Sequence, residues 1–211
     1  MTARRAVLFL AGAVLARVHG GAASAQAPGN AAAQAPGDAA APVPGEGRAP
    51  RLPPVILSDH EGRRWPFAEL ARRRPVAVSF FFTGCTTLCP PQTMAMANLQ
   101  EELGRRIPLD GESSPLLLSV SLDPLGDTPQ AMQDYAGQFG LSLGPRRGWL
   151  LLTGEPQALA RVWAAFEAAG NRPEDHTAML WLGQPGGRRW RRASALAAPE
   201  TLADLLLRGT T

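Results

Sequence analysis

The chain has 211 residues, and 45% of them are hydrophobic, which is enough for one folded domain with a substantial core. Its formal charge of +3 comes from three arginines near the amino terminus, because all 18 acidic residues lie beyond residue 25 and are matched there by arginines. This balance gives no reason to expect a nucleic acid or a membrane surface as the partner of the domain.

Residues 1–25 have the layout of a secretory signal. Residues 1–5 carry two arginines, residues 6–16 form an uncharged apolar run, and small side chains at residues 23–25 suit a cleavage site. The run is short for a bilayer span, so we expect an exported, periplasmic protein from which the signal is removed. The alternative is an uncleaved anchor that tethers the domain to the inner membrane and provides its only membrane contact.

Residues 26–51 are rich in Ala, Pro and Gly and contain one octet twice, AQAPGNAA from Ala25 and AQAPGDAA from Ala33. Such a segment cannot bury enough apolar surface to offset the entropy that ordering would cost. We therefore expect a disordered tether here and a folded domain over residues 52–211, which is a normal size for one domain.

Within the domain, short apolar runs alternate with segments of helical spacing. The runs are almost continuously apolar, as expected of strands that are covered on both faces. They span residues 76–82, 116–120, 149–152 and 178–182. Turn-forming residues at 59–62 and 184–187 predict two hairpins in addition.

The segments between the runs repeat apolar residues at intervals of three and four. Residues 96–103, 132–139 and 159–166 follow this pattern, and prolines stand near the predicted helix starts. A last helix is predicted to begin at Pro199. The order of elements predicts an α/β, thioredoxin-like, three-layer fold with a central mixed sheet, an N-terminal hairpin and a C-terminal helix.

The only two cysteines, Cys85 and Cys89, lie in the stretch FFTGCTTLCPPQ, where the first long strand is predicted to end. Proline is tolerated only in the first turn of a helix, so Pro90 and Pro91 predict that a helix begins at Cys89. Backbone N–H groups and the positive end of the helix dipole favour a thiolate at such a place. At least one of the two thiols should therefore have a depressed pKa.

A structural disulfide is the first alternative, because exported proteins commonly contain one. A bridge between these two cysteines would close a loop of only a few residues and constrain the unfolded chain little. Redox chemistry or metal binding is thus the better interpretation, although the spacing differs from the C-x-x-C redox motif.

Two histidines lie beyond residue 25. His60 stands in a turn-rich segment and is expected to be a solvent-exposed turn residue, whereas His176 just precedes an apolar run, where a loop meets the sheet. A lone histidine in that place is more often a surface or capping residue than a ligand. Together with two thiolates, however, it would complete a soft, low-coordinate set that suits Cu(I) and leaves zinc one ligand short. Met94 and Met96 fit core packing better than an auxiliary role as ligands.

Three segments together resemble the SCO/SenC family of copper-binding, thioredoxin-fold proteins. They are the C-x-x-x-C-P pattern within residues 81–90, the run from residue 119 through Asp127-Thr128-Pro129, and Asp175-His176-Thr177 before a strand. The resemblance spans about residues 52–208. It implies that Cys85, Cys89 and His176 match the family's copper ligands, for Cu(I) and also for Cu(II).

The resemblance further implies delivery of copper to, or thiol reduction of, the binuclear copper site of a respiratory oxidase. The partner would be the copper-receiving subunit of that oxidase, or another periplasmic copper or thiol protein. The chain departs from the family at Thr86, Thr87 and Leu88, where Pro and Asp are common, and at Gly126, where Arg is usual. These departures leave the three ligands intact and alter the surface around them.

Three other functions remain open from the residues alone. A thiol–disulfide oxidoreductase would cycle Cys85 and Cys89 between dithiol and disulfide, with His176 only tuning their pKa values. A peroxide-reducing enzyme would use one cysteine as the attacking thiolate and the other to resolve the product. A purely structural disulfide would show neither metal binding nor redox activity.

Overall fold

A computed structural model describes residues 49–168 and 178–208 of the chain. These residues belong to one compact unit, which spans residues 40–211. The predicted signal, residues 26–48 of the predicted tether and His176 lie outside the described residues. None of the helices in the described ranges is both long enough and apolar enough to cross a membrane.

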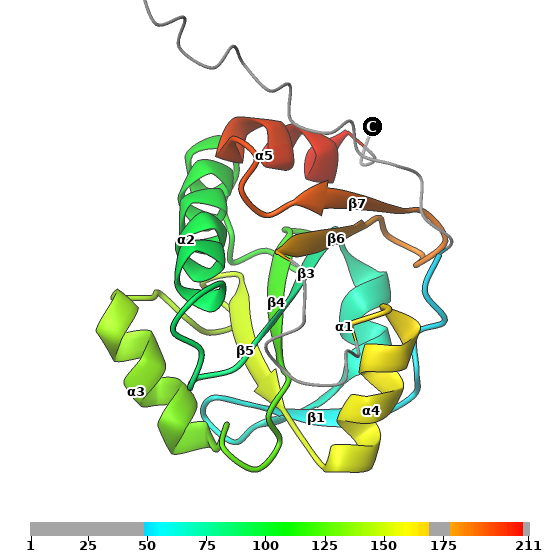
Figure 1. The fold of residues 1–211 in the computed structure, drawn as a ribbon. Coiled ribbons are helices and arrows are strands. Elements are labelled where there is room, and N and C mark those ends of the chain that lie inside the picture. Colours follow the sequence, from blue (N-terminus) through cyan, green and yellow to red (C-terminus); the bar gives the residue numbers. More distant parts are fainter. Residues whose placement is uncertain (1–48, 169–177, 209–211) are drawn as a thin grey trace, which may run out of the picture. The chain divides into compact units, whose positions relative to one another are not determined.

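The centre of the fold is a mixed sheet of seven strands in the order β2-β1-β5-β4-β3-β6-β7 (Figure 1). The middle strands β3, β4 and β5 are parallel, and the outer pairings are antiparallel. The strands are β1 (Ile56–Asp59), β2 (Arg64–Pro66), β3 (Val76–Phe81), β4 (Leu116–Ser121), β5 (Trp149–Thr153), β6 (Met179–Gly183) and β7 (Trp190–Ser194). The four predicted runs correspond to β3, β4, β5 and β6, and the predicted hairpin between β6 and β7 is confirmed.

Five helices accompany the strands in the described part, and the last of them follows β7. They are α1 (Phe67–Arg73), α2 (Cys89–Arg106), α3 (Pro129–Phe139), α4 (Pro156–Ala165) and α5 (Pro199–Leu207). All but α1 have proline in the first turn, where its missing N–H costs no helical hydrogen bond. Helix α1 is not predicted from the sequence, because its seven residues are too few to show a helical repeat.

Two hydrophobic cores lie on opposite faces of the sheet. Helices α1 and α4 cover one face, and α2, α3 and α5 cover the other (Figure 1). Along β3, Val76, Val78 and Phe80 enter the first core, whereas Ala77 and Phe81 enter the second. Strands covered on both faces need apolar side chains at nearly every position, which explains the continuous runs. The predicted three-layer α/β fold is confirmed.

The turn between β1 and β2 contradicts one prediction. His60 is only 5% exposed, although it was expected to lie in solvent. Its backbone N–H donates to the Leu151 carbonyl of β5 at 3.1 Å, and its own carbonyl accepts a hydrogen bond from the Gln133 side chain of α3 at 2.6 Å. Burial lowers the pKa of His60, although the negative charges of Asp59 and Glu61 act to raise it. The pairing with β5, which the local sequence does not reveal, buries this histidine.

Candidate functional site

Cys85 and Cys89 lie where β3 leads into α2. Cys85 is in the connecting loop, where its backbone N–H donates to the Phe82 carbonyl at 3.1 Å. Cys89 is the first residue of α2, as the two prolines after it predict. The site therefore stands at the carboxyl end of a central parallel strand, which is where open α/β sheets commonly carry their functional groups.

The two cysteines are in direct contact. The backbone N–H of Cys89 donates a hydrogen bond to the sulfur of Cys85 at 3.2 Å, and no disulfide joins them. Cys85 is 7% exposed and Cys89 is fully buried. Both side chains pack into the core that α2, α3 and α5 share, so a reagent or an ion reaches Cys85 before it reaches Cys89.

The surroundings shift the two thiol pKa values in opposite directions. Burial raises the pKa of Cys85, but hydrogen bonds from the Cys89 side chain and from backbone N–H groups outweigh it, and the net pKa is below that of an ordinary thiol. Burial raises the pKa of Cys89, and the hydrogen bond to Cys85 raises it further. The expected depressed pKa thus belongs to Cys85, and Cys89 is held as the protonated partner.

Asp127 ties a second loop to the cysteine loop. Its carboxylate accepts hydrogen bonds from the Thr83 backbone at 2.8 Å, from the Thr83 hydroxyl at 2.7 Å and from the Ser121 hydroxyl at 2.5 Å. Burial raises the pKa of Asp127 in spite of these donors. In the sequence, Asp127 stands only as part of the Asp127-Thr128-Pro129 motif, and no local pattern shows that it reaches Thr83.

Tyr135 of α3 lies on the other flank of the cysteine helix. Its hydroxyl shares a hydrogen bond of 2.6 Å with the hydroxyl of Thr93 in α2. Burial raises the pKa of Tyr135 to about 12, and the charges of the nearby Cys89 and Cys85 contribute to the shift. The helical pattern predicts that Tyr135 lies on an apolar helix face, and its ring is indeed buried. The pattern predicts no role for its hydroxyl.

The mouth of the site is formed by the exposed residues between the cysteines and by the loop of Leu125, which also contains Asp123. Residues 79–100 contain no charged side chain, and Leu88, between the cysteines, is exposed. Leu125, in the loop that Asp127 anchors, is 84% exposed. Met94 is exposed too, contrary to the expectation that it packs in the core, whereas Met96 is buried as predicted. Two residues along a helix correspond to a turn of about 200°, so these methionines cannot share one face.

The ligand set predicted from the sequence is only partly visible. The structure brings Cys85 and Cys89 together, while His176 and its neighbour Asp175 lie outside the described residues. Within residues 49–168 and 178–208, no group of three or more His, Cys, Asp or Glu side chains is placed to hold a metal ion. The two sulfurs suit a soft ion such as Cu(I) rather than a hard cation that needs several oxygen ligands.

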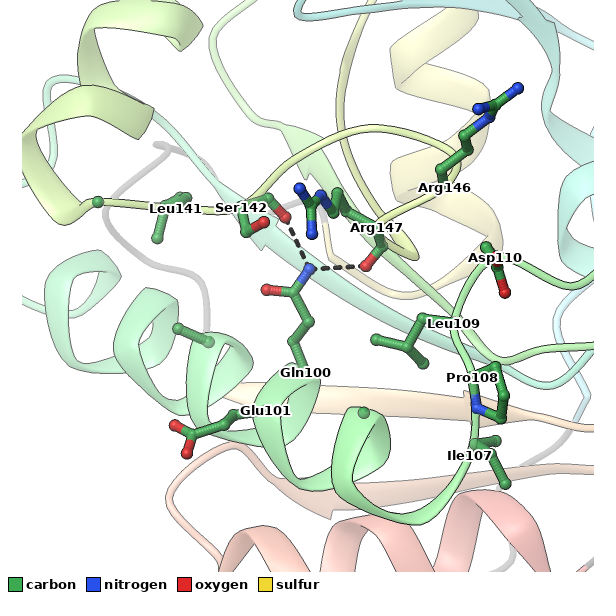
Figure 2. A pocket seen from close by; sticks show the side chains of 13 residues that line it. Gln100, Glu101, Ile107, Pro108, Leu109, Asp110, Leu141, Ser142, Arg146 and Arg147 are labelled. Atoms are coloured by element: carbon green, nitrogen blue, oxygen red, sulfur yellow. Dashed lines mark hydrogen bonds between the residues drawn. The ribbon is translucent and has the colours of Figure 1, made fainter.

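A pocket of about 600 Å³ lies along α2 away from the cysteines. Figure 2 shows Gln100 reaching from α2 to the opposite loop, where its amide donates to the carbonyls of Ser142 and Arg147, each at 2.7 Å. The remaining lining mixes apolar groups with charged side chains such as Glu101 and Arg146. Gln100 is therefore a structural tie, and the pocket includes neither cysteine.

The fold and the site define a class: thioredoxin-like proteins with a cysteine pair at the junction of a central strand and a helix. The model of the SCO1/SenC family matches residues 49–209, and the chain belongs to this family. A Bacillus subtilis relative, "SCO1 protein homolog", is 31% identical over 116 residues, which cover 52% of this chain and 56% of that protein. The chain spans less than two thirds of the length of the curated relatives that it matches.

Two solved structures share the fold. One is BsSco, described as a member of the Sco family of cytochrome c oxidase assembly proteins, with 23% identity, a TM-score of 0.64, and coverage of 80% of this chain and 98% of that one. The other is Bradyrhizobium japonicum ScoI with copper bound, with 22% identity, a TM-score of 0.60, and coverage of 75% and 98%. At this level of identity, the likeness concerns the fold alone.

The structure accounts for one departure from the family pattern. The backbone N–H of Gly126 donates to the Asp123 carboxylate at 3.0 Å, and a Cβ atom at this position would run into that carboxylate. A side chain at this position, such as the arginine that is usual in the family, therefore requires the Asp123 carboxylate to shift, which glycine avoids. Thr86, Thr87 and Leu88, which replace the common Pro and Asp between the cysteines, are all exposed at the mouth.

Proposed function

We propose that this chain is an exported copper-binding protein that carries Cu(I) on Cys85 and Cys89, with His176 as the third ligand. Its role is to deliver copper to, or to reduce the thiols of, the binuclear copper site of a respiratory oxidase. Membership of the SCO1/SenC family supports the proposal, as does a relative of the same fold whose structure has copper bound.

The observation that carries the proposal is the contact between Cys89 and Cys85 at the start of α2. Two sulfurs from one loop and one helix end form a soft donor pair, and thiolate ligands select Cu(I). A site of two or three ligands leaves the ion open to exchange with donor atoms of a partner. The exposed Leu88 and Leu125 at the mouth support a partner that presents its copper ligands beside apolar side chains.

One observation also favours thiol–disulfide exchange as a second function. The lowered pKa of Cys85 and the raised pKa of Cys89 give one attacking thiolate and one protonated resolving thiol. In such a reaction the Cys85 thiolate attacks a partner disulfide and releases one partner thiolate. Cys89 then attacks Cys85 in the mixed disulfide, forming the Cys85–Cys89 bond and releasing the second partner thiol. BsSco, which shares the fold, is described as having a disulfide switch.

The deciding experiment is a titration of the reduced protein with Cu(I) in the presence of a competing chelator. We expect one Cu(I) per chain, with binding abolished by Cys85→Ser or Cys89→Ser and strongly weakened by His176→Ala. The matched control is His60→Gln, which alters the other histidine beyond residue 25 and should leave the Cu(I) affinity unchanged. Stoichiometric binding that persists without both cysteines would refute the proposal.

The His176→Ala variant separates the two functions when its rate of disulfide exchange is measured beside its Cu(I) affinity. If His176→Ala loses Cu(I) affinity but keeps its rate of disulfide exchange, the histidine acts through the metal. Copper loading should also fall at acid pH, because both sulfurs must lose their protons to bind the ion, and Cys89 holds its proton tightly. Loading that is independent of pH would contradict sulfur ligation.

A further inference from the structure

Gln92 carries a buried amide at the start of the cysteine helix. The side chain is 2% exposed, and among residues 49–168 and 178–208 neither its Nε2 nor its Oε1 atom has a hydrogen-bond partner. Buried polar groups are nearly always paired, and leaving one unpaired costs free energy. Such a group calls for a specific explanation, and its position at the start of the cysteine helix offers one.

Helix geometry directs this amide toward Cys89. The buried stripe of α2 near its start consists of Cys89, Gln92, Thr93 and Met96. Residues three apart on a helix have Cβ atoms about 5–6 Å apart. Helical side chains also slope back toward the amino end and cover the residues three and four positions earlier. Gln92 therefore neighbours Cys89 on the same buried stripe of α2, while Thr93 is already paired with Tyr135.

The prolines explain why a side chain is needed there. The first N–H groups of a helix normally stabilise an anion at its amino end. In α2 the Cys89 N–H is used by the Cys85 sulfur, Pro90 and Pro91 have no N–H, and the Gln92 N–H donates to the Leu88 carbonyl at 3.2 Å. The N–H groups of residues 90–92 are thus not available to the sulfur of Cys89, which has its backbone hydrogen bond from Phe82, and a side-chain amide on the next turn can supply a further donor.

We propose that Gln92 is a positioning residue of the cysteine site, whose amide N–H donates a hydrogen bond to the Cys89 sulfur when that sulfur binds copper or carries charge. This rests on the proposed function for the copper-loaded state. The sulfur is a stronger acceptor for this N–H when it carries negative charge. Outer hydrogen bonds of this kind typically change metal affinity by about 10- to 100-fold.

The test compares two variants. Gln92→Leu removes the amide and, unlike a substitution by methionine, introduces no sulfur near the site. Gln92→Glu keeps the size of the side chain but replaces the N–H donor. Met96→Leu is the matched control, because it changes the same buried stripe one turn later. We expect both Gln92 variants to bind Cu(I) about tenfold more weakly than the parent and the control. The reduced, copper-free Gln92→Leu protein should melt a few degrees higher, because a buried unpaired amide is gone.

If Gln92→Leu bound Cu(I) with the affinity of the parent, the inference would be overturned. It would also be overturned if Gln92→Leu melted well below Met96→Leu, because the amide would then be needed for the stability of the fold. If the parent protein binds no Cu(I), the proposed function fails and a second measurement decides. The reduced protein is mixed with bis(2-hydroxyethyl) disulfide, so that the Cys85 thiolate attacks one sulfur and releases one 2-mercaptoethanol. The rate at which Cys89 then attacks the Cys85 mixed disulfide, forming the Cys85–Cys89 bond and releasing the second 2-mercaptoethanol, is followed. A rate about tenfold lower in Gln92→Leu supports the inference, and an unchanged rate overturns it.

Discussion

Asp127 binds Thr83 twice, through the backbone N–H and through the side-chain hydroxyl, with both hydrogen bonds ending on the same carboxylate oxygen. The two residues stand in loops that follow the neighbouring parallel strands β3 and β4. One of these loops carries Cys85, and the other carries the exposed Leu125. The pair therefore fixes the mouth of the site with one buried carboxylate.

Replacing this carboxylate should loosen the mouth. We expect Asp127→Ala to lower the free energy of unfolding by about 2–4 kcal/mol, because the buried donors of Thr83 and Ser121 lose a charged acceptor. Denaturant unfolding at pH 7 measures the change. The control is Asp134→Ala, an exposed site whose only described side-chain bond is to Gln130, and it should cost less than about 0.5 kcal/mol. Equal effects at the two positions would contradict this role.

The two cysteines should react at different rates with an alkylating reagent. Cys85 is the more accessible thiol and has the lowered pKa, so it should be modified first, with a rate that rises through a pKa below that of an ordinary thiol. Mass spectrometry of briefly alkylated, reduced protein identifies the site. Cys85→Ser should lose the fast phase and Cys89→Ser should keep it. Two thiols of equal reactivity would argue against the asymmetry.

Asp59 should stabilise the fold in a pH-dependent way. Burial raises the pKa of this carboxyl, but hydrogen bonds from Trp65, Arg63 and Glu61 outweigh it and lower the pKa overall. A lowered folded-state pKa gives stability that is present above the unfolded pKa of about 3.9 and lost as the pH falls through the folded value.

Accordingly, Asp59→Ala should lose about 3 kcal/mol of unfolding free energy at pH 7, and the loss should shrink toward pH 2. Unfolding curves at the two pH values measure both quantities. The exposed Glu61 of the same turn serves as the control, since Glu61→Ala should cost less than about 1 kcal/mol. A loss that grows on acidification would have the wrong sign for this mechanism.

Two glycines should respond to alanine in opposite directions. A Cβ atom at Gly183 of β6 would lie 2.6–2.8 Å from the Trp190 ring, so Gly183→Ala should destabilise by about 1–3 kcal/mol through overpacking. A Cβ atom at Gly137 within α3 meets nothing within 4 Å. Gly137→Ala should therefore stabilise by about 0.5–1 kcal/mol through helix propensity. Melting temperatures of the two variants check both signs. A Gly183→Ala protein of parental stability would show that the indole ring moves aside freely, and a destabilised Gly137→Ala protein would contradict the helix-propensity argument.

The elements of the fold follow from local patterns in the sequence. Continuous apolar runs predict the central strands because a strand covered by helices on both faces needs an apolar side chain at almost every position. Prolines mark where α2 to α5 begin, since a first helical turn needs no N–H from them. The start of α2 at Cys89, and with it the placement of both thiols at a helix end, could therefore be predicted from neighbouring residues alone.

Only the tertiary structure decided which polar groups surround that helix end. Asp127 meets Thr83, and His60 is buried beside β5, because distant strands pair in one register. Which sulfur has the lower pKa depends on three-dimensional burial and on the direction of single N–H groups. Gln92 stands in the sequence as an ordinary polar residue, and its buried, unpaired amide becomes visible only in the packed helix. Periodicity reports which side of an element is apolar, whereas hydrogen bonding between remote segments depends on how the whole chain packs.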